Sequence, residues 1–424
     1  MTTGFVLYDD AIARAAEPFA LTRPMGELRV GALLIRERWS RVLGTAPSAF
    51  VGAPHLARFT EFGSPAAARG TLAAGTIVVN TRCAPALDAI VAHLKPGDAV
   101  VVDGVVAAVA LPGAVDSAKL ASGTAALGDF ARGTATTIHG WWLTHSWDIV
   151  RHLPPMLAAD ATVLGAGITD APPVHLAVLG EHAAAVARGA YIEPHVVFDT
   201  TNGAVVVMPG ARINAFTRIA GPAVIGAEAI VAGGRFSCVA IGEHSRVCGE
   251  MSVVIVQGHA NKAHDGFVGH SVLGRWSNLG AMTTTSNLKN SYGPVRVATA
   301  AGETDTGMQF LGSLVGDHAK TAIGTRLMTG TIIGAGANVF GDRSPDKRVP
   351  PFAWGDRAPF KRYEREKFLD VAAHVLQRRG HALTDALRAT LGAAEEETRR
   401  KKPKKKAKAP PKAKTKTTRG RRGR

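Results

Sequence analysis

Two hydrophobic patterns follow one another along the chain. In roughly the first 180 residues, short apolar runs alternate with mixed stretches; the runs are Phe5–Tyr8, Thr76–Val79 and Ala99–Val102. Residues Arg29–Leu43 place apolar side chains among arginines and glutamates at the spacing of one helix face. Strands that alternate with helices predict a three-layer α/β domain, which we assign to residues 1–180.

From about residue 185 to 345 the apolar residues recur every six positions, a period that no helix uses. The recurring positions are Ile213, Ile219, Ile225, Val231, Ile241, Val247, Val253, Phe267, Leu273 and Leu279. Glycine often follows, as in Ile225-Gly226 and Ile241-Gly242. These hexads predict a parallel β-helix, a triangular coil of about 18 residues with one aliphatic side chain of each flat side pointing inward. The alternative is a β-sandwich in which the hexads arise by chance.

The repeat is interrupted twice, between Val253 and Phe267 and from about Asn287 to Leu311. An interrupted solenoid projects loops, and loops on a rigid scaffold commonly carry function. Residues 346–398 predict an extended proline-rich segment followed by two helices, at about 361–379 and 384–397. The final segment, 399–424, is rich in Lys, Pro, Ala and Arg and predicts a disordered tail.

The charge of the chain changes this picture little. The formal net charge is +16, but residues 399–424 hold 9 Lys and 6 Arg without an acid, so the remainder carries only +1. We interpret the tail as a solvated segment, with non-specific binding to nucleic acid or another polyanion as the alternative. No apolar run is long enough to span a bilayer and no signal peptide begins the sequence, which predicts a cytoplasmic protein without a membrane partner.

Polar residues gather where the first predicted strand ends. The stretch Val6–Trp39 contains two aspartates, Asp9 and Asp10, and several arginines. The carboxyl ends of parallel strands are where open α/β sheets bind ligands, and guanidinium groups suit phosphate oxygens. The alternative, strongest for Arg36–Arg38, is a surface helix with ordinary Glu–Arg pairs.

The stretch Val6–Trp39, with Val79–Pro85 and Trp147–Val150, resembles the divergent sugar nucleotidyltransferase domain of a bacterial bifunctional family. Its members join this domain to a left-handed β-helix acyltransferase and are regarded as alternative forms of the enzyme that makes UDP-N-acetylglucosamine from glucosamine 1-phosphate. The resemblance covers about residues 4–380. It implies a left-handed coil, a homotrimer, a nucleoside triphosphate and a sugar 1-phosphate as substrates, acetyl-CoA as acyl donor, and Mg²⁺ for nucleotidyl transfer.

The sequence departs from mainstream nucleotidyltransferases, because their Gly-rich opening loop is absent. Arg23 stands near the place of their phosphate-contacting lysine, and Asn80 and Arg82 follow a strand where they carry a metal-binding aspartate. Candidate metal ligands are Asp9, Asp10 and Asp103, although Asp103-Gly104 also reads as a hairpin turn. The candidates for nucleotide and phosphate binding are Asp9, Asp10, Arg14, Thr22, Arg23, Glu27, Arg29, Asn80 and Arg82.

A second candidate site lies in the interrupted coil. The stretch Gln257–Gly269, with Ser277–Ala281 and Thr285–Asn287, resembles the acetyltransferase coil of the same family. That resemblance makes His264 the base that takes a proton from the sugar amine. It makes Asn278 and Asn287 positioning residues, and it offers Lys262, Lys289, His318 and Lys320 for acyl-CoA binding. An imidazole with a pKa near ~6.5 suits this task at neutral pH; His259 and His270 are alternative bases, and a structural histidine is the default.

Three functions remain open from the sequence. The first is a bifunctional sugar-nucleotide enzyme that transfers a nucleotidyl and an acetyl group. The second keeps only nucleotidyl transfer, with the β-helix as an oligomerising or regulatory scaffold. The third is a non-catalytic protein that senses a sugar nucleotide, and the missing Gly-rich loop supports it.

Overall fold

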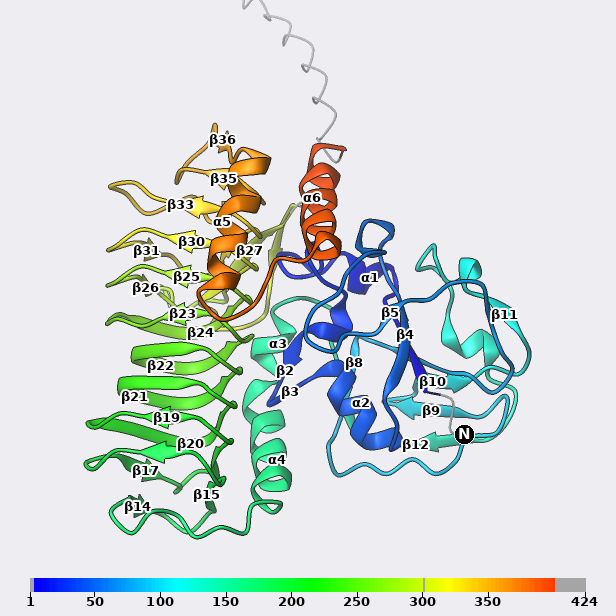
Figure 1. Ribbon diagram of the computed structural model, residues 1–424, viewed down its shortest axis with the longest axis horizontal. Helices are drawn as coiled ribbons and strands as arrows, with labels where there is room; N and C mark the ends of the chain where they lie inside the picture. Colours follow the sequence, from blue (N-terminus) through cyan, green and yellow to red (C-terminus); the bar gives the residue numbers. More distant parts are fainter. Residues whose placement is uncertain (1–3, 300–301, 401–424) are drawn as a thin grey trace, which may run out of the picture.

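The chain folds into an α/β domain that lies against one side of a tall β-helix (Figure 1). The computed structural model describes residues 4–299 and 302–400. The predicted α/β domain, the left-handed β-helix of the hexapeptide type and the C-terminal helices are all present. Most of the predicted tail, residues 401–424, lies outside the described residues.

The N-terminal domain is built on a seven-stranded sheet with the order β12-β9-β10-β7-β1-β4-β5. β1 is parallel to both of its neighbours, β4 and β7, so the winding reverses between β1 and β7. Such a switch point is where open α/β sheets bind ligands. The strands of this sheet are β1 (Phe5–Tyr8), β4 (Pro47–Val51), β5 (Ala66–Ala67), β7 (Ile77–Asn80), β9 (Ala99–Val102), β10 (Val105–Ala110) and β12 (Ala135–Thr137).

Short elements complete this domain. The paired strands are β2 (Arg29–Val30) with β3 (Leu33–Leu34), β6 (Thr71–Leu72) with β11 (Val115–Asp116), and β8 (Cys83–Pro85) with β13 (Gly140–Trp142). The helices are α1 (Ala11–Arg14), α2 (Ile35–Leu43), α3 (Asp148–Arg151) and α4 (Leu153–Gly165). The helix predicted for residues 29–43 therefore begins six residues later, because Gly31, at φ +66°, turns β2 back into β3.

Arg38 shows that α2 is not a surface helix. Its side chain is fully buried, and Nη1 and Nη2 donate to the carboxylate of Asp160 on α4 at 2.6 and 3.0 Å. The same guanidinium donates to the carbonyl oxygens of Val30 and Pro85. Arg38 therefore fastens α2 to α4, which in turn lies along the β-helix (Figure 1).

The β-helix is one continuous stack of parallel strands. The register pairs Val186 with Val207, Ile241 with Val256 and Val315 with Ile333, so these coils take 21, 15 and 18 residues, and the coil from Leu273 to Val315, which holds the second interruption, takes 42. Its strands are β14 (Ala177–Leu179), β15 (Ala184–Val186), β16 (Tyr191–Ile192), β17 (Val197–Asp199), β18 (Val205–Val207), β19 (Arg212–Ile213), β20 (Thr217–Ile225), β21 (Ile230–Ile241), β22 (Arg246–Val256), β23 (Asn261–Lys262), β24 (Phe267–Leu273), β25 (Asn278–Leu279), β29 (Ser313–Val315), β30 (Lys320–Thr321), β32 (Thr331–Ile333), β33 (Asn338–Val339), β34 (Arg348–Val349), β35 (Ala353–Trp354) and β36 (Lys361–Arg362), the last of which is antiparallel.

Most predicted hexad anchors point into the prism, and two do not. Ile213, Ile219, Ile225, Val231, Ile241, Val247, Leu273 and Leu279 belong to the buried core of the coil. Val253 instead turns a corner at φ +56° while Val254 points inward, and Phe267 is half-buried while Val268 points inward. The coil from Ile241 to Val256 is shorter than three full hexads, so the register shifts at these two positions.

Two faces and two edges of the prism surround the candidate sites. The docking face carries apolar residues that point outward into the core shared with α3 and α4; they are Val206, Val224, Ala240, Ile255, Val272, Leu314 and Ile332. The polar face carries Arg246, Asn261, Asn278, Lys320 and Asn338 in successive coils. The covered edge joins these two faces at His244, His259, Trp276 and His318; the free edge, on the far side of the polar face, carries Phe216, His264, Met282 and Ile323.

The C-terminal helices close over the covered edge. α5 (Arg365–Gln377) and α6 (Asp385–Arg400) follow the two predicted helices, and α5 runs down the outside of the prism (Figure 1). Phe368 of α5 packs with Trp276 and Phe352 in one buried cluster. The second interruption of the repeat forms a hairpin, β27 (Arg296–Thr299) with β28 (Gly302–Asp305), between β26 (Thr284–Thr285) and β31 (Arg326–Leu327). None of the helices in the described parts of the chain combines the length and apolarity that crossing a membrane requires.

Candidate functional site

A hollow of about 650 Å³ lies at the switch point of the N-terminal sheet. The ends of β1 and β7, the β9–β10 turn and the loop at residues 123–128 surround it. Its lining is Asp10, Ala11, Ile12, Asn80, Arg82, Gly104, Val105, Val106, Gly123, Thr124, Ala125, Ala126, Leu127 and Gly128. The small side chains leave room for a ligand, and the polar groups converge on the strand ends.

Asp10, Asn80 and Arg82 form the polar centre of this hollow. The carboxylate of Asp10 caps α1, accepts the Nδ2–H of Asn80 at 3.0 Å and pairs with Nε and Nη2 of Arg82 at 2.8 Å. The guanidinium of Arg82 also lies 5.2 Å from the ring centre of Trp142. Within residues 4–299 and 302–400, Nη1 of Arg82 has no hydrogen-bond partner. The Arg82–Asp10 ion pair therefore leaves the Nη1 N–H groups of Arg82 available to a ligand in the hollow.

Asp9 and Arg14 support the hollow from behind. Both oxygens of Asp9 are used, one by the hydroxyl of Thr81 at 2.6 Å and one by the N–H of Met25 at 3.1 Å. Burial raises the pKa of Asp9 to about 6. Arg14 donates to the carbonyls of Asp9, Leu120 and Ala121 and so holds the loop beside the hollow. Asp103, at φ +49°, turns β9 into β10 and is exposed.

The residues of the hollow fit a metal-bound nucleotide only through Asp10. Asp10 is the one carboxylate in its lining, and the described residues contain no cluster of three potential metal ligands. Mg²⁺ usually binds proteins through one or two carboxylates and takes its other ligands from phosphates and water. Asp10 could therefore contact the Mg²⁺ of a metal–nucleotide complex by giving up one of the hydrogen bonds that its oxygens accept from α1, Asn80 and Arg82, whereas Asp9 is buried and does not line the hollow.

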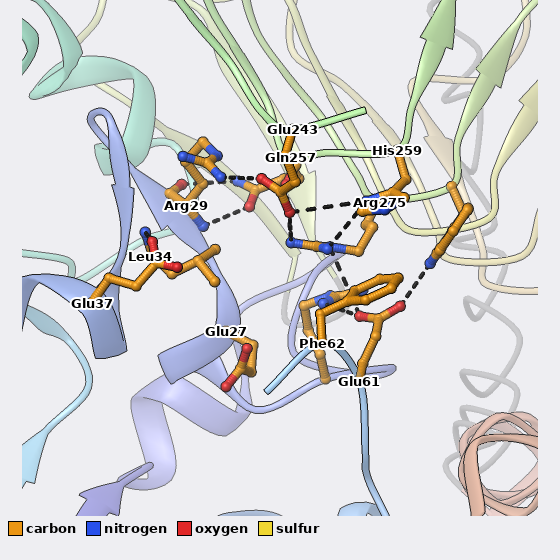
Figure 2. A network of polar contacts seen from close by, with 12 residues as sticks. Glu27, Arg29, Leu34, Glu37, Glu61, Phe62, Glu243, Gln257, His259 and Arg275 are labelled. Atoms are coloured by element: carbon orange, nitrogen blue, oxygen red, sulfur yellow. Dashed lines mark hydrogen bonds and ion pairs between the residues drawn. The ribbon is translucent and has the colours of Figure 1, made fainter. Parts of the chain in front are cut away.

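Four other predicted phosphate ligands of the N-terminal domain lie at the boundary with the β-helix, and Figure 2 shows Arg29, which is one of them, beside Glu243 and Gln257. Arg23 pairs through Nε with Asp317 at 2.6 Å and through Nη1 with Glu61 at 2.8 Å, and all three side chains are buried. Thr22 donates its hydroxyl to Asp317 at 2.8 Å. Burial alone would raise the pKa of Glu61, but Arg23 and Arg275 outweigh it and lower the pKa to about 2.

Arg29 and Glu27 belong to the same boundary. The backbone N–H of Arg29 donates to Oε1 of Gln257 at 2.6 Å, and its guanidinium pairs with Glu243, which also pairs with Arg275 at 2.8 Å. Glu27 accepts from Arg36 at 3.0 Å. A cavity of about 210 Å³ remains here, lined by Glu27, Leu34, Arg36, Glu37, Glu61, Phe62, Glu243 and Arg275. The structure thus brings Thr22, Arg23, Glu27 and Arg29 to the β-helix and not to the hollow.

Aromatic rings stack along the covered edge beside this network. His259 lies 4.4 Å from Phe62 and 4.4 Å from Trp276, centre to centre, and His318 lies 5.8 Å from Phe368. Burial, with the nearby charge of Arg275, lowers the pKa of His259 to about 3. Burial, with the charge of Lys320, lowers the pKa of His318 to about 3. Both imidazoles are therefore neutral in the folded protein at physiological pH.

We expect the protein to lose stability on mild acidification. Both histidines have a folded pKa below the unfolded value near ~6.5, so their contribution is present above that pH and is lost as the pH falls toward 3. From pH 7.5 to 5.5 the two would cost about 2–3 kcal/mol, and Asp9, whose pKa is raised, would offset about 1 kcal/mol. The check is the urea midpoint at both pH values. A loss just as large in the His259→Gln/His318→Gln variant would contradict this assignment.

The predicted acyl-transfer residues are spread over the β-helix. His264 is exposed on the free edge, and its imidazole has no hydrogen-bond partner in the described part of the chain. Oδ1 of Asn278, on the polar face, accepts from Asn261 at 2.8 Å. Asn287 lies 2.9 Å from Nδ1 of His270, whose ring stacks on Phe310. A single chain therefore does not bring His264, Asn278 and Asn287 into contact with one another.

The four candidates for acyl-CoA binding occupy different environments. Lys262 points into the prism, where Nζ donates to the carbonyls of His264 and Asp265, and His318 is sealed beneath α5. Lys289 donates to the carbonyl of Pro294 in the second interruption. Only Lys320 lies on the polar face, and burial lowers its pKa to about 8.

Comparisons with known proteins concern the N-terminal domain. Residues 5–169 match the model of the family described as sugar nucleotidyl transferase. The match runs from β1 to just beyond α4 and covers less than half of the chain, so the β-helix lies outside it. No curated protein matches the chain. The N-terminal part is thus similar to a sugar nucleotidyl transferase domain, and the chain joins it to a β-helix.

Proposed function

We propose that the protein is a sugar-nucleotide enzyme that transfers a nucleotidyl group to a sugar 1-phosphate in the hollow at the β1–β7 switch point. One observation carries this proposal: in a domain that matches sugar nucleotidyl transferases, the strand ends hold Arg82 with a free guanidinium edge over an open hollow. Phosphates need positioning and charge neutralisation more than covalent chemistry, and a guanidinium supplies both.

The geometry divides the work between three side chains. A phosphate oxygen of the sugar 1-phosphate would attack the α-phosphorus of the nucleoside triphosphate; the new P–O bond forms as the bond to the β-phosphate breaks and pyrophosphate leaves. Arg82 would neutralise the charge that develops on the α-phosphate. Asp10 holds Arg82 in place and is the residue that would take Mg²⁺, which supplies further charge neutralisation when bound. Asn80 fixes the other side of Asp10.

The test is release of pyrophosphate by the full-length protein with Mg²⁺. We expect release only when a nucleoside triphosphate and a hexose 1-phosphate or amino-hexose 1-phosphate are both present. A panel of the common triphosphates and sugar phosphates identifies the pair. Binding of a triphosphate without release from any pair would instead support the non-catalytic sensor, and no binding at all would refute the proposal.

For the β-helix we propose acetyl transfer to the amine of an amino-sugar phosphate, with formation of UDP-N-acetylglucosamine as the overall activity that the sequence resemblance favours. The amine nitrogen would attack the thioester carbon, the C–S bond would break, and the nitrogen would lose its proton to His264. The supporting observation is the exposed imidazole of His264 on the free edge. Phe216, Met282 and Ile323 share this edge and are 80%, 58% and 77% exposed, so a neighbouring prism of a homotrimer would cover them and complete the site.

Thiol release tests this second activity separately. With glucosamine 1-phosphate and acetyl-CoA, we expect the wild type to release free thiol and His264→Ala to release it at least 100-fold more slowly, since general-base catalysis contributes about 10²–10⁴ in rate. His182→Ala, which changes an exposed histidine in the turn between β14 and β15, is the matched control. Equal rates in wild type and His264→Ala would remove His264 from this role. No thiol release beside normal pyrophosphate release would leave the β-helix as a scaffold.

A further inference from the structure

One polar row on the β-helix is not explained by the fold. Arg246, Asn261, Asn278, Lys320 and Asn338 occupy the same outward position in successive coils of the polar face. Neighbouring strands lie about 4.8 Å apart, so Arg246 and Lys320 stand roughly 14 Å apart along the stack. The row contains no carboxylate, and the four residues from Asn261 onward are half-buried. It thus offers cations and amides side by side over the length of an extended ligand.

The cations near this row lack acidic partners. Among the described residues, Arg246, Arg378 and Arg379 make no ion pair, whereas most arginines at the domain boundary do. α5 brings its C-terminal end to the level of β22 and β23 (Figure 1). Burial lowers the pKa of Arg379, and the charges of Arg246 and Arg378 lower it further. Arg378 is the C-cap of α5 and Arg379 follows it, so the end of this helix brings two guanidinium groups near Arg246, and no counter-ion for these three groups comes from the described residues.

We propose that the polar face binds an extended phosphorylated ligand, with its phosphates against Arg246, Arg378 and Arg379 and its uncharged part along Asn261 and Asn278. Guanidinium groups pair with phosphate oxygens through two parallel hydrogen bonds, which explains why arginines gather here. The amides of Asn261 and Asn278 bond to each other once and keep further donors and acceptors for a ligand.

Coenzyme A has this chemistry, since a diphosphate is joined to a chain that contains two amides. His264 lies just beyond the far end of the Asn261 strand, at the corner that follows β23, so a ligand that crosses the polar face from Arg379 would point toward it. Identifying the ligand as the acyl donor rests on the proposed acetyl transfer. The phosphate site itself does not, because a nucleoside triphosphate also carries phosphates that these arginines would bind.

The experiment is calorimetric titration of the full-length protein at physiological salt with three probes: coenzyme A, uridine triphosphate and inorganic tripolyphosphate. The test variant is Arg246→Gln/Arg379→Gln. The matched control is Arg218→Gln/Arg235→Gln, which removes the same charge from the neighbouring face, where each arginine already pairs with an acid. We expect coenzyme A to bind the control like the wild type and to bind the test variant at least tenfold more weakly.

Each result of the titration either supports or overturns the proposed site. Weaker binding of coenzyme A in the test variant alone supports the site, even if the protein releases no thiol, in which case only the acetyl transfer fails. If coenzyme A does not bind, and the test variant alone loses binding of uridine triphosphate or tripolyphosphate, the phosphate site is supported. Its ligand is then a nucleotide or a polyphosphate and not coenzyme A. Equal affinities in the wild type and both variants, or equal losses in both variants, would overturn the proposal, because binding would then come from elsewhere or from net charge.

Discussion

Asp317→Ala is expected to lower the free energy of unfolding by about 3–5 kcal/mol, the cost of leaving a buried charge without its partner. The carboxylate of Asp317 is fully buried and accepts from Nε of Arg23, from the hydroxyl of Thr22 and from the backbone N–H of Arg275. Its removal leaves Arg23 buried with Glu61 alone. Chemical denaturation followed by tryptophan fluorescence measures the loss.

A second ion pair across the same boundary serves as the control for Asp317. Glu17 and Arg348 join the N-terminal domain to the β-helix, but their side chains are 35% and 31% exposed. Exposed pairs contribute about 0–1 kcal/mol, so Glu17→Ala should change little. Adding Arg23→Met to Asp317→Ala should recover part of the loss, because the unpaired cation is removed as well. Equal effects of Asp317→Ala and Glu17→Ala would show that the buried network does not hold the two parts together.

Arg82→Met is expected to lower kcat/KM for pyrophosphate release at least 100-fold, since removing one preorganised donor from a charge-stabilising site costs about 10²–10³ in rate. The side chains of the Arg82–Asp10 pair are only 15% and 13% exposed, so the variant should also lose some stability, and kcat/KM is measured well below its melting temperature. Arg82→Lys should recover only part of the activity, because an ammonium keeps the charge but loses the planar fork.

The matched control for Arg82 is Arg212→Met. Arg212 also lies over an aromatic ring, 5.3 Å from the centre of Tyr191, but it belongs to the β-helix, far along the chain from the hollow. It should leave pyrophosphate release unchanged. Full activity in Arg82→Met would exclude the hollow as the place of nucleotidyl transfer, whatever the protein's other activities.

Local patterns explain how much of the fold could be predicted. The six-residue period is a property of neighbouring residues, so Ile213, Ile225 and Leu279 revealed the β-helix without any knowledge of distant contacts. The start of α2 was misplaced because the hairpin around Gly31 buries the same apolar residues that a helix would. The sequence predicts a surface position for Arg38, because its buried partner Asp160 lies more than a hundred residues away.

For the candidate sites, too, the contacts that local patterns indicate were predicted, and contacts between residues far apart in the sequence were not. Asp10, Asn80 and Arg82 follow two strands of one sheet, and the structure brings them together as strand-end reasoning predicts. Arg23 was an equally plausible phosphate ligand, but its guanidinium pairs with Asp317. No local sequence pattern links two positions that are 294 residues apart. Arg246 and Arg379 were missed for a related reason: the path of α5 down the prism, which places them near each other, depends on packing at Trp276 and Phe352.

The contacts between the covered edge and the N-terminal domain also limit where the β-helix can gain or lose coils. Solenoids generally tolerate gain or loss of whole repeats, because each repeat contacts only its neighbours. Here Glu243, Gln257, Arg275 and Asp317 come from four successive coils, and each is held by the N-terminal domain or by a residue that the domain holds. Deleting one coil between them would displace Asp317 from Arg23 by a full rung of about 4.8 Å. Relatives of this protein should therefore vary in coil number only outside this span, toward either end of the stack.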